Sequence, residues 1–218
     1  MSAGITTLKN AGAAGILCEV ADVIVANKAY LSEIDGKIGD GDHGFNMAKG
    51  FGRAKERIDG ASETLDSAMR TLSDILMSEI GGSMGPLYGM MFSDMADALD
   101  GAAEMDAALF GRMIRAGLEG VQAIGSARVG DKTLLDTLVP AVETYEAALA
   151  EGDGWSQALG RMKTAAEAGR DSTRDMVAKM GRSSRLGERS RGVLDAGATS
   201  CCLILAAFAD GIGRRITR

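Results

Sequence analysis

Three aspartates lie close together in the first quarter of the chain. Asp35, Asp40 and Asp42 fall within eight residues, and Gly39 and Gly41 separate them. Glycine lets the backbone turn sharply, so neighbouring carboxylates can converge. Converging carboxylates repel one another unless a cation lies between them, and oxygen ligands suit Mg²⁺ or Ca²⁺. The segment therefore indicates a site for a hard divalent cation, with an Asp-rich turn that caps the next helix as the alternative.

The same segment resembles two known motifs, and both are excluded. Gly39, Gly41 and Gly44 have the spacing of a dinucleotide-binding fingerprint, but that fingerprint follows a strand, and here a helical pattern precedes it. An EF-hand needs a bidentate glutamate at its twelfth position, and counting from Asp40 this position is Phe51.

A second glycine-rich segment, residues 81–86, lies between two apolar helical patterns. Backbone N–H groups in such a loop, at the start of a helix, bind phosphate. Pro86 suits the first turn of the helix that follows. The segment predicts a phosphate-binding loop, and an ordinary turn between helices is the alternative.

A third segment, residues 125–136, nearly spells a P-loop. Asp131 interrupts the junction between Gly130 and Lys132, and no apolar strand precedes it. A P-loop is therefore excluded. Asp131 or Thr133 is expected to cap the helix that follows.

A fourth segment, residues 181–200, carries Arg182, Arg185, Arg189 and Arg191 within ten residues. The planar guanidinium group matches phosphate oxygens, although a solvated Arg/Glu loop is the alternative. An acidic metal loop, a glycine loop and an arginine loop together are the parts of a Mg-nucleotide site for phosphoryl transfer.

Helical periodicity dominates the rest of the chain, and no convincing alternating strand is found. Short connections between the helices favour an all-α, antiparallel up-and-down bundle or barrel that forms a single domain over residues 1–218. The last helix is apolar nearly all round, which places it centrally. Eight helices are expected, at about 16–31, 46–58, 65–80, 87–99, 105–124, 134–149, 155–180 and 198–212.

Composition excludes several classes of protein. The net charge of −6 gives no support for nucleic-acid binding. The longest mainly apolar stretch, residues 196–209, is shorter than a membrane span, and no signal peptide is evident. The three cysteines, an odd number without a C-x-x-C pair, indicate reduced thiols in a cytoplasmic protein.

Over essentially its whole length the chain resembles the nucleotide-binding L subunit of dihydroxyacetone kinase. That resemblance implies an eight-helix antiparallel barrel with the nucleotide in the loops at one end. The matching strings are IGDGDHGFNM at 38–47, GGSMGPLYG at 81–89, GDKT at 130–133, GERS at 187–190 and DAGATS at 195–200.

The resemblance also implies roles for single residues. Asp35, Asp40 and Asp42 would hold two Mg²⁺ ions against the phosphates of ADP or ATP, and Arg182 would be the catalytic arginine that stabilises the transferring phosphoryl group. Gly125 and Leu134 would lie near the adenine. The full set of expected nucleotide-binding residues is His43, Gly44, Phe45, Asn46, Gly82, Ser83, Met84, Gly125, Thr133, Leu134, Arg182, Asp195, Ala196 and Gly197.

Four departures from the family pattern affect this site. Met84 stands where a small polar residue is expected, Ala196 replaces a proline, and Arg185 replaces an aromatic residue. A histidine often found before Asp195 is absent, because Val193 and Leu194 precede that aspartate. The nucleotide contacts are therefore expected to differ in detail from those of the family.

The resemblance places the ketose site, with its covalent histidine, in a separate K subunit. His43 is the only histidine here, so this chain is expected to be a phosphotransferase only with its partner. The donor is either ATP or a bound ADP rephosphorylated by a phosphohistidine protein of the phosphotransferase system. The alternatives are a kinase subunit for another ketose such as erythrulose, a nucleotide-bound module that regulates a transcription factor, and a metal-stabilised bundle without nucleotide.

Overall fold

The computed structural model describes residues 6–216. Within that range the chain forms nine α-helices, two 3₁₀ segments and two short strands. The α-helices are α1 (Ala14–Ala26), α2 (Lys28–Ile38), α3 (His43–Arg57), α4 (Leu65–Glu79), α5 (Met84–Leu99), α6 (Ala107–Ile124), α7 (Leu135–Ala150), α8 (Trp155–Ser172) and α9 (Ala196–Ile216). The other elements are β1 (Thr7–Lys9), β2 (Glu104–Asp106), η1 (Thr173–Asp175) and η2 (Arg182–Ser190).

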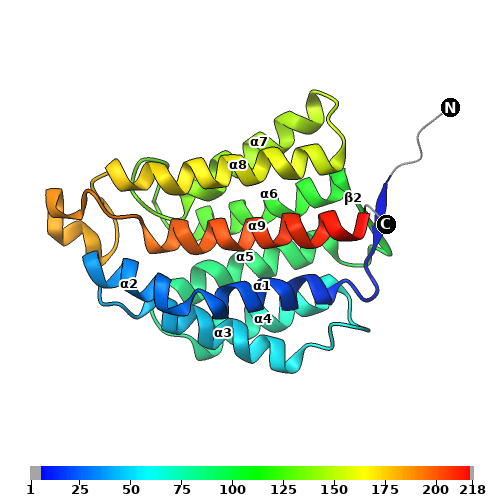
Figure 1. The fold of residues 1–218 in the computed structure, drawn as a ribbon. Helices are drawn as coiled ribbons and strands as arrows, with labels where there is room; N and C mark the ends of the chain where they lie inside the picture. The colour runs from blue at the N-terminus through cyan, green and yellow to red at the C-terminus, as the bar shows by residue number, and fades with distance from the viewer. Residues whose placement is uncertain (1–5, 217–218) are drawn as a thin grey trace.

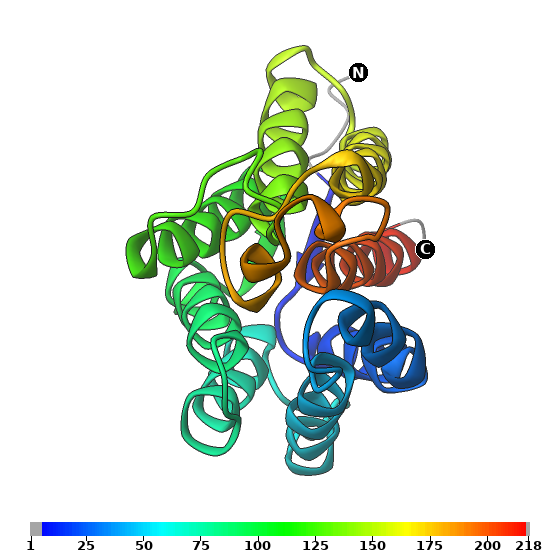
Figure 2. The ribbon, with the colours of Figure 1, turned by 90° about the vertical axis from the view of Figure 1, so that its left-hand side faces the viewer.

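The long helices lie side by side along one direction in Figure 1, and the end-on view of Figure 2 shows that they form a closed ring. Each helix from α3 to α9 packs against the next, and α1 packs against both α9 and α3. Because neighbours in the ring run in opposite directions, the connections gather at its two ends. This arrangement confirms the expected all-α, up-and-down barrel.

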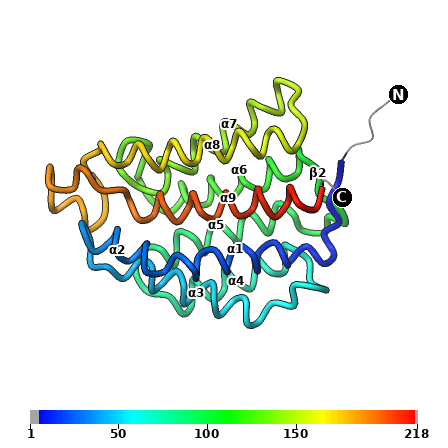
Figure 3. The backbone as a smooth tube through the Cα atoms, in the orientation of Figure 1, coloured from blue at the N-terminus to red at the C-terminus, as the bar shows by residue number. Residues whose placement is uncertain are grey.

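The two ends of the barrel differ. Figure 2 looks onto the end where α2 and the segment between α8 and α9 lie, and Figure 3 traces that long segment at the same end as α2. At the opposite end β1 and β2 pair antiparallel, with Leu8 opposite Met105. The four segments that the sequence singles out therefore belong to the end without strands.

Apolar residues at helical spacing build the core. In α4, Leu65, Met69, Leu72 and Leu76 are all buried, so one face of the helix is apolar. The Thr64 side chain accepts a hydrogen bond from the Ser67 N–H at 3.3 Å and caps this helix. The other helices of the ring contribute similar faces to one continuous core, whereas Ile34 of α2 packs in a separate small cluster with Leu194 and Ala196.

The centre of the barrel contains aromatic rings, one of which comes from α9, itself a helix of the ring. Phe92 packs edge-on against Phe51 at 5.8 Å between ring centroids and lies 6.4 Å from Phe208 of α9. By length and composition α9 alone, among the helices of residues 6–216, is apolar enough to cross a membrane, and 72% of its apolar window is buried inside the fold. The last helix is thus mostly buried, but it is not central as expected: it is a member of the ring, between α8 and α1. It is also longer than the apolar stretch that predicted it.

Two of the predicted helices are wrong in their extent. The first, expected to be continuous over 16–31, breaks at Asn27, whose side chain donates to the Val23 carbonyl at 2.8 Å. The seventh, expected to reach Met180, leaves the α-helix after Ser172 and turns through η1. Its apolar spacing continues past the end of the helix, so periodicity alone did not reveal the stop.

Some boundaries of the other predicted helices are also wrong. α3 begins at His43, three residues earlier than expected, because the Asp35 carboxylate accepts from the His43 N–H and supports an earlier start. The fifth predicted helix begins at Ala107 because Met105 belongs to a strand. Neither strand was predicted: each is three residues long with one buried side chain, too short to show alternation.

Candidate functional site

The end of the barrel without strands contains a cavity of about 630 Å³, a size typical of small-molecule sites. Parts of all four segments that the sequence singled out line it. Of the expected site residues, fifteen line the cavity and two do not. Those that line it are Asp35, Asp40, Asp42, His43, Asn46, Gly82, Ser83, Met84, Gly125, Thr133, Leu134, Arg182, Asp195, Ala196 and Gly197.

The three aspartates converge as expected. One carboxylate oxygen from each of Asp35, Asp40 and Asp42 lies within 4.8 Å of the others. The turn between α2 and α3 brings them together, and a Cβ at Gly39 would overlap the Asp35 carboxylate. Asp35 also accepts from the His43 N–H at 3.3 Å, so helix capping and carboxylate convergence occur in one turn. Three carboxylates at this spacing are a donor set that fits Mg²⁺.

Arg182 lies across the cavity from α2 and forms an ion pair with Asp40. Its side chain is 66% exposed, so the guanidinium is accessible at the cavity. Of the four clustered arginines, Arg182 is the one that lines the described cavity. Arg191 instead bonds to Glu188 at 3.0 Å, as the alternative of a solvated Arg/Glu loop predicted.

Only some of the expected residues of α3 line the cavity, because a helix turns successive residues in different directions. His43 and Asn46 are three positions apart and both line the cavity. Gly44 packs on α2, where a Cβ would overlap the Lys28 carbonyl oxygen. Phe45 is 57% exposed, and its ring lies 4.1 Å from the Lys28 Nζ. The structure therefore does not bring Gly44 or Phe45 into the cavity.

The His43 side chain belongs to a hydrogen-bonded group with Ser200 and Tyr88. His43 Nε2 lies 2.9 Å from Ser200 Oγ, and the buried Tyr88 hydroxyl lies 2.7 Å from the same oxygen. Desolvation lowers the pKa of His43 to about 4, while the Asp35 charge opposes that shift. The ring is therefore neutral at pH 7. Sequence reasoning assigned no role to Tyr88 or Ser200, although both lie inside the matching strings.

The glycine loop ends at the N-terminus of α5. The Ser83 side chain makes no capping hydrogen bond to the helix, and the positive end of the helix dipole favours an anion here. Met84, the unusual residue of this loop, is 7% exposed and packs with the core. An apolar side chain therefore stands at this place in the cavity lining, where a small polar residue was expected.

One wall of the cavity is apolar. Val121 and Ile124 from the end of α6 and Leu87 from α5 line the cavity together with the expected residues Gly125 and Leu134. Such a wall suits the face of a flat ring. Val121 and Ile124 were assigned to the helical stripe alone; their place in the last turn of α6, next to Gly125, is the signal that indicates the cavity.

The turn before α7 and the start of α9 complete the site. The Asp136 carboxylate accepts from the N–H groups of Gly130 and Thr133, at 2.5 and 2.7 Å, which fixes the turn. The Thr133 hydroxyl accepts from the Leu135 N–H at 3.2 Å, and Asp131 accepts from the Arg128 N–H. The N-cap position of α7 is Leu134, without a side-chain capping bond, so neither Thr133 nor Asp131 caps this helix as expected.

Asp195 caps α9 by accepting from the Ala198 N–H at 2.7 Å. Desolvation of this carboxyl group raises its pKa to about 7, and the charge of Lys132 opposes the rise. A carboxyl group that titrates near neutrality thus lies in the same cavity as the three clustered aspartates.

Known proteins are similar to this chain in sequence and in fold. A family model described as the DAK2 domain matches residues 37–210. The ADP-binding subunit of PEP-dependent dihydroxyacetone kinase 1 from Listeria innocua is 38% identical over 183 residues, 84% of this chain and 86% of the relative. The ADP-binding subunit of the PEP-dependent dihydroxyacetone kinase from Escherichia coli is 34% identical over 194 residues, 88% of this chain and 92% of the relative.

A solved structure has the same fold. The dihydroxyacetone kinase of C. freundii in complex with AMP-PNP and Mg²⁺ matches with a TM-score of 0.69 and 24% identity, over 96% of this chain and 36% of that chain. Because the family model covers most of the sequence and the bacterial relatives match over nearly their whole length, this chain belongs to the DAK2 domain family, together with ADP-binding subunits of dihydroxyacetone kinases.

Proposed function

We propose that this chain is the nucleotide-binding, phosphoryl-transfer subunit of a dihydroxyacetone-type kinase. One observation carries the proposal: the three converging carboxylates and Arg182 lie in one cavity with an apolar wall. The names of the bacterial relatives, ADP-binding subunits of dihydroxyacetone kinases, support the same assignment.

The cavity suits each part of a Mg-nucleotide. Asp35, Asp40 and Asp42 would hold two Mg²⁺ ions, and bound Mg²⁺ supplies positive charge that neutralises phosphate oxygens. The N-terminus of α5 offers N–H groups to the phosphates. The base would lie on the wall formed by Ile124 and Leu134.

Arg182 is proposed as the catalytic residue. In this structure its guanidinium pairs with Asp40. When that carboxylate binds a cation, the guanidinium is free to pair with a phosphoryl oxygen, because guanidinium groups match the geometry of phosphate. Its exposed position at the cavity is suited to a phosphoryl group that must leave for an acceptor on another chain.

The acceptor is proposed to be a short ketose bound to a separate K subunit. The donor is proposed to be ADP that stays bound and is rephosphorylated by a phosphohistidine protein, because both bacterial relatives are named as PEP-dependent and ADP-binding. His43, the single histidine, lines the cavity, bonds to Ser200 and is proposed to bind the nucleotide, so the phosphohistidine would come from another protein. The three free cysteines are consistent with the cytoplasm as the site of this relay.

The test compares donors and one substitution. The chain is mixed with its K subunit and dihydroxyacetone or erythrulose, with either ATP or a phosphoenolpyruvate-driven relay as the donor. We expect transfer from the relay. Arg182→Met should lower kcat by about a hundredfold or more while ADP stays bound. The control is Arg189→Met, an exposed arginine of the same loop that does not line the cavity.

Two results would contradict the assignment. A chain that neither co-purifies with a nucleotide nor binds Mg-ADP in calorimetry has no such site. Full transfer by Arg182→Met would remove the catalytic role of that arginine and leave nucleotide binding as the supported function.

A further inference from the structure

Lys132 is an unusual residue in the turn before α7. It is 1% exposed, although lysine is rarely fully buried, and the hydrogen bonds of its side chain go to backbone carbonyls rather than to a carboxylate. Its backbone φ is +63°, and it is the one non-glycine residue of the described range with a positive φ. That conformation is uncommon for residues with a side chain. Two unfavourable features at one position indicate that the side chain has a specific role.

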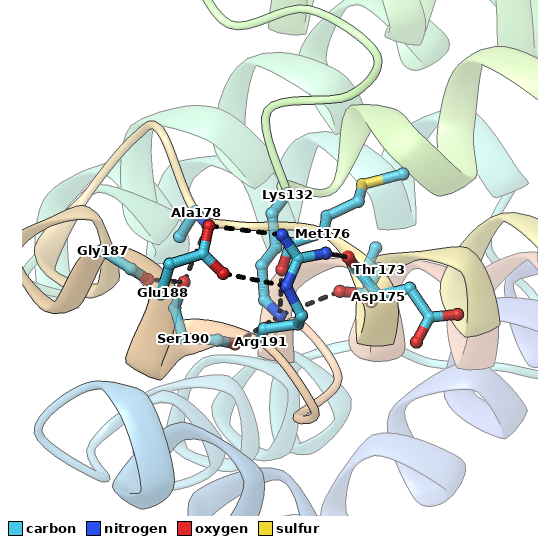
Figure 4. Close-up of polar contacts among 9 residues, drawn as sticks. All are labelled: Lys132, Thr173, Asp175, Met176, Ala178, Gly187, Glu188, Ser190 and Arg191. Carbon is cyan, nitrogen blue, oxygen red and sulfur yellow. Dashed lines mark hydrogen bonds and ion pairs between the residues drawn. The ribbon is translucent and has the colours of Figure 1, made fainter.

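The Lys132 ammonium group is surrounded by backbone carbonyls (Figure 4). Its Nζ lies within hydrogen-bond distance of the carbonyl oxygens of Thr173 (2.8 Å), Met176 (3.2 Å), Ser190 (2.7 Å) and Val193 (2.6 Å). An ammonium group has three N–H donors and no acceptor, so the four carbonyl oxygens occupy all of its donors. Its partners are therefore main-chain groups of one segment, residues 173–193, here called the arginine segment.

The four carbonyls belong to the two ends of the arginine segment. Thr173 and Met176 lie where the chain leaves α8, and Ser190 and Val193 lie where it returns toward α9. Lys132 thus joins the outgoing and returning chains at the base of the segment. Arg182 lies between these two ends and pairs with Asp40 across the cavity.

Other contacts hold the arginine segment together as a folded unit. The Ser190 hydroxyl donates to the Gly187 carbonyl at 2.7 Å and accepts from the Ala178 N–H at 2.9 Å. The Gly192 N–H donates to the Arg174 carbonyl at 2.7 Å. Without Lys132, four carbonyls at the base would lose their common donor, so water would have to replace it.

We propose that Lys132 is a positioning residue whose buried ammonium group ties the two ends of the arginine segment together and thereby places Arg182 over the aspartate cluster. The role of Arg182 in transfer rests on the proposed function above. The hydrogen bonds from Lys132 to the four carbonyls, here called the tie, do not depend on nucleotide or metal. It acts locally, because all four acceptors belong to the arginine segment rather than to the helices of the ring.

Hydrogen exchange of the whole chain tests the tie directly. In Lys132→Met, which keeps the length of the side chain and removes the donors, amides of residues 173–193 should exchange about tenfold faster or more, because the segment opens locally. Amides of α4 and α5 should be unchanged. Lys179→Met is the control: that lysine is exposed and bonds only to Asp131 at 3.2 Å, so its loss should leave the segment protected.

Kinetics with the K subunit test the positioning of Arg182. Lys132 lines the cavity, but its ammonium group bonds to carbonyls of the arginine segment. Lys132→Met should therefore lower kcat by about tenfold while the Kd for ADP changes by less than about threefold, because the proposed Mg²⁺ ligands and the apolar lining residues are unaltered. Unchanged exchange would overturn the proposal, as would faster exchange that spreads equally to all helices, unfolding of the whole barrel, or an unchanged kcat. A wild-type chain that transfers no phosphoryl group, combined with local opening in Lys132→Met, would refute the proposed function and leave the tie intact.

Chemical rescue provides a second test. Lys132→Ala removes the atoms that propylammonium contains, so propylammonium should restore exchange protection and kcat over the same concentration range. Propanol, which has the same shape without the charge, should restore neither. Equal rescue by propanol, or no rescue by propylammonium, would show that the charge is not the tie.

Discussion

Asp195 shows how one residue of the site connects stability with pH. Its pKa in the folded chain is about 7, well above its ordinary value of 3.8. Between those values the folded state binds more protons than the unfolded state, so the free energy of unfolding falls as the pH rises through this window. The penalty for the charged carboxylate is complete above pH 7 and absent below pH 4.

Asp195→Asn should remove this dependence. The amide oxygen still accepts the Ala198 N–H bond that caps α9, but the group no longer titrates. In thermal unfolding without metal or nucleotide, the wild-type Tm should fall relative to that of the variant between pH 5 and pH 8. Parallel curves for the two proteins would show that Asp195 is ionised throughout that range.

Among single residues, the sequence predicted site residues that lie close together in the chain. It missed those that only the packing of the helices brings together. The aspartates are recognisable because they are close in sequence, and fifteen expected residues line the cavity. Tyr88 and Ser200 lie on different helices and meet only in the folded barrel. Gly44 and Phe45 were assigned with their neighbours as one stretch, whereas the helix turns them away from the cavity.

Among the elements, the turn between α2 and α3 has a strict geometric requirement. Gly39 follows α2, and a Cβ there would overlap the end of the Asp35 side chain. That side chain can rotate away, and the Asp35 carbonyl oxygen, 3.0 Å from such a Cβ, needs to move by only a few tenths of an ångström. An added methyl group should therefore displace a metal ligand without unfolding the helices. The turn, rather than the helices beside it, sets the arrangement of the carboxylates.

Gly39→Ala should therefore weaken Mg-ADP binding by about tenfold, by analogy with displaced groups in other metal sites, and leave the Tm of the nucleotide-free chain nearly unchanged. The matched control is Gly36→Ala in α2, where a Cβ would make only an ordinary contact of 3.8 Å with the Gly41 Cα. Calorimetry on both variants measures the difference. Equal affinities would mean that Asp35 does not bind the metal in its present position.

The helices themselves were predictable wherever apolar periodicity and tertiary packing agree. They disagree at Asn27, where the side chain takes the Val23 carbonyl and α1 ends although the apolar stripe continues. They disagree again after Ser172, where Lys132 takes the carbonyls of Thr173 and Met176. In both places a polar side chain competes for backbone groups, and an apolar pattern carries no information about that competition.

In the molecule as a whole, the barrel architecture followed from the number of apolar stripes and the short connections between them. The four unusual loops predicted that the site lies at one end of the barrel, because helices in alternating directions bring every second connection to the same end. The two short strands at the opposite end did not follow, since each contributes one buried residue. They join distant parts of the chain without changing the order of the ring.

The charge of the whole molecule predicts how it responds to loss of metal. The chain has a net charge of −6, and the ion pair between Arg182 and Asp40 provides one positive group for three clustered carboxylates. Mg-ADP at about a hundred times its Kd should raise the Tm by roughly 5–10 °C through binding to the folded state alone. A chelator should release the nucleotide and abolish that rise, because ADP adds further negative charge to the carboxylates.

Two variants make the result specific. Asp42→Asn should remove most of the rise in Tm even with excess Mg²⁺, since it deletes one ligand of the cluster. Asp210→Asn changes the net charge equally but lies on α9, where Asp210 pairs with Lys163 at 2.7 Å, so it should keep the full response. If chelation leaves the melting curve of the wild-type complex unchanged, or if both variants respond alike, the acidic cluster binds no metal and the nucleotide depends on the helix N-terminus and arginine alone.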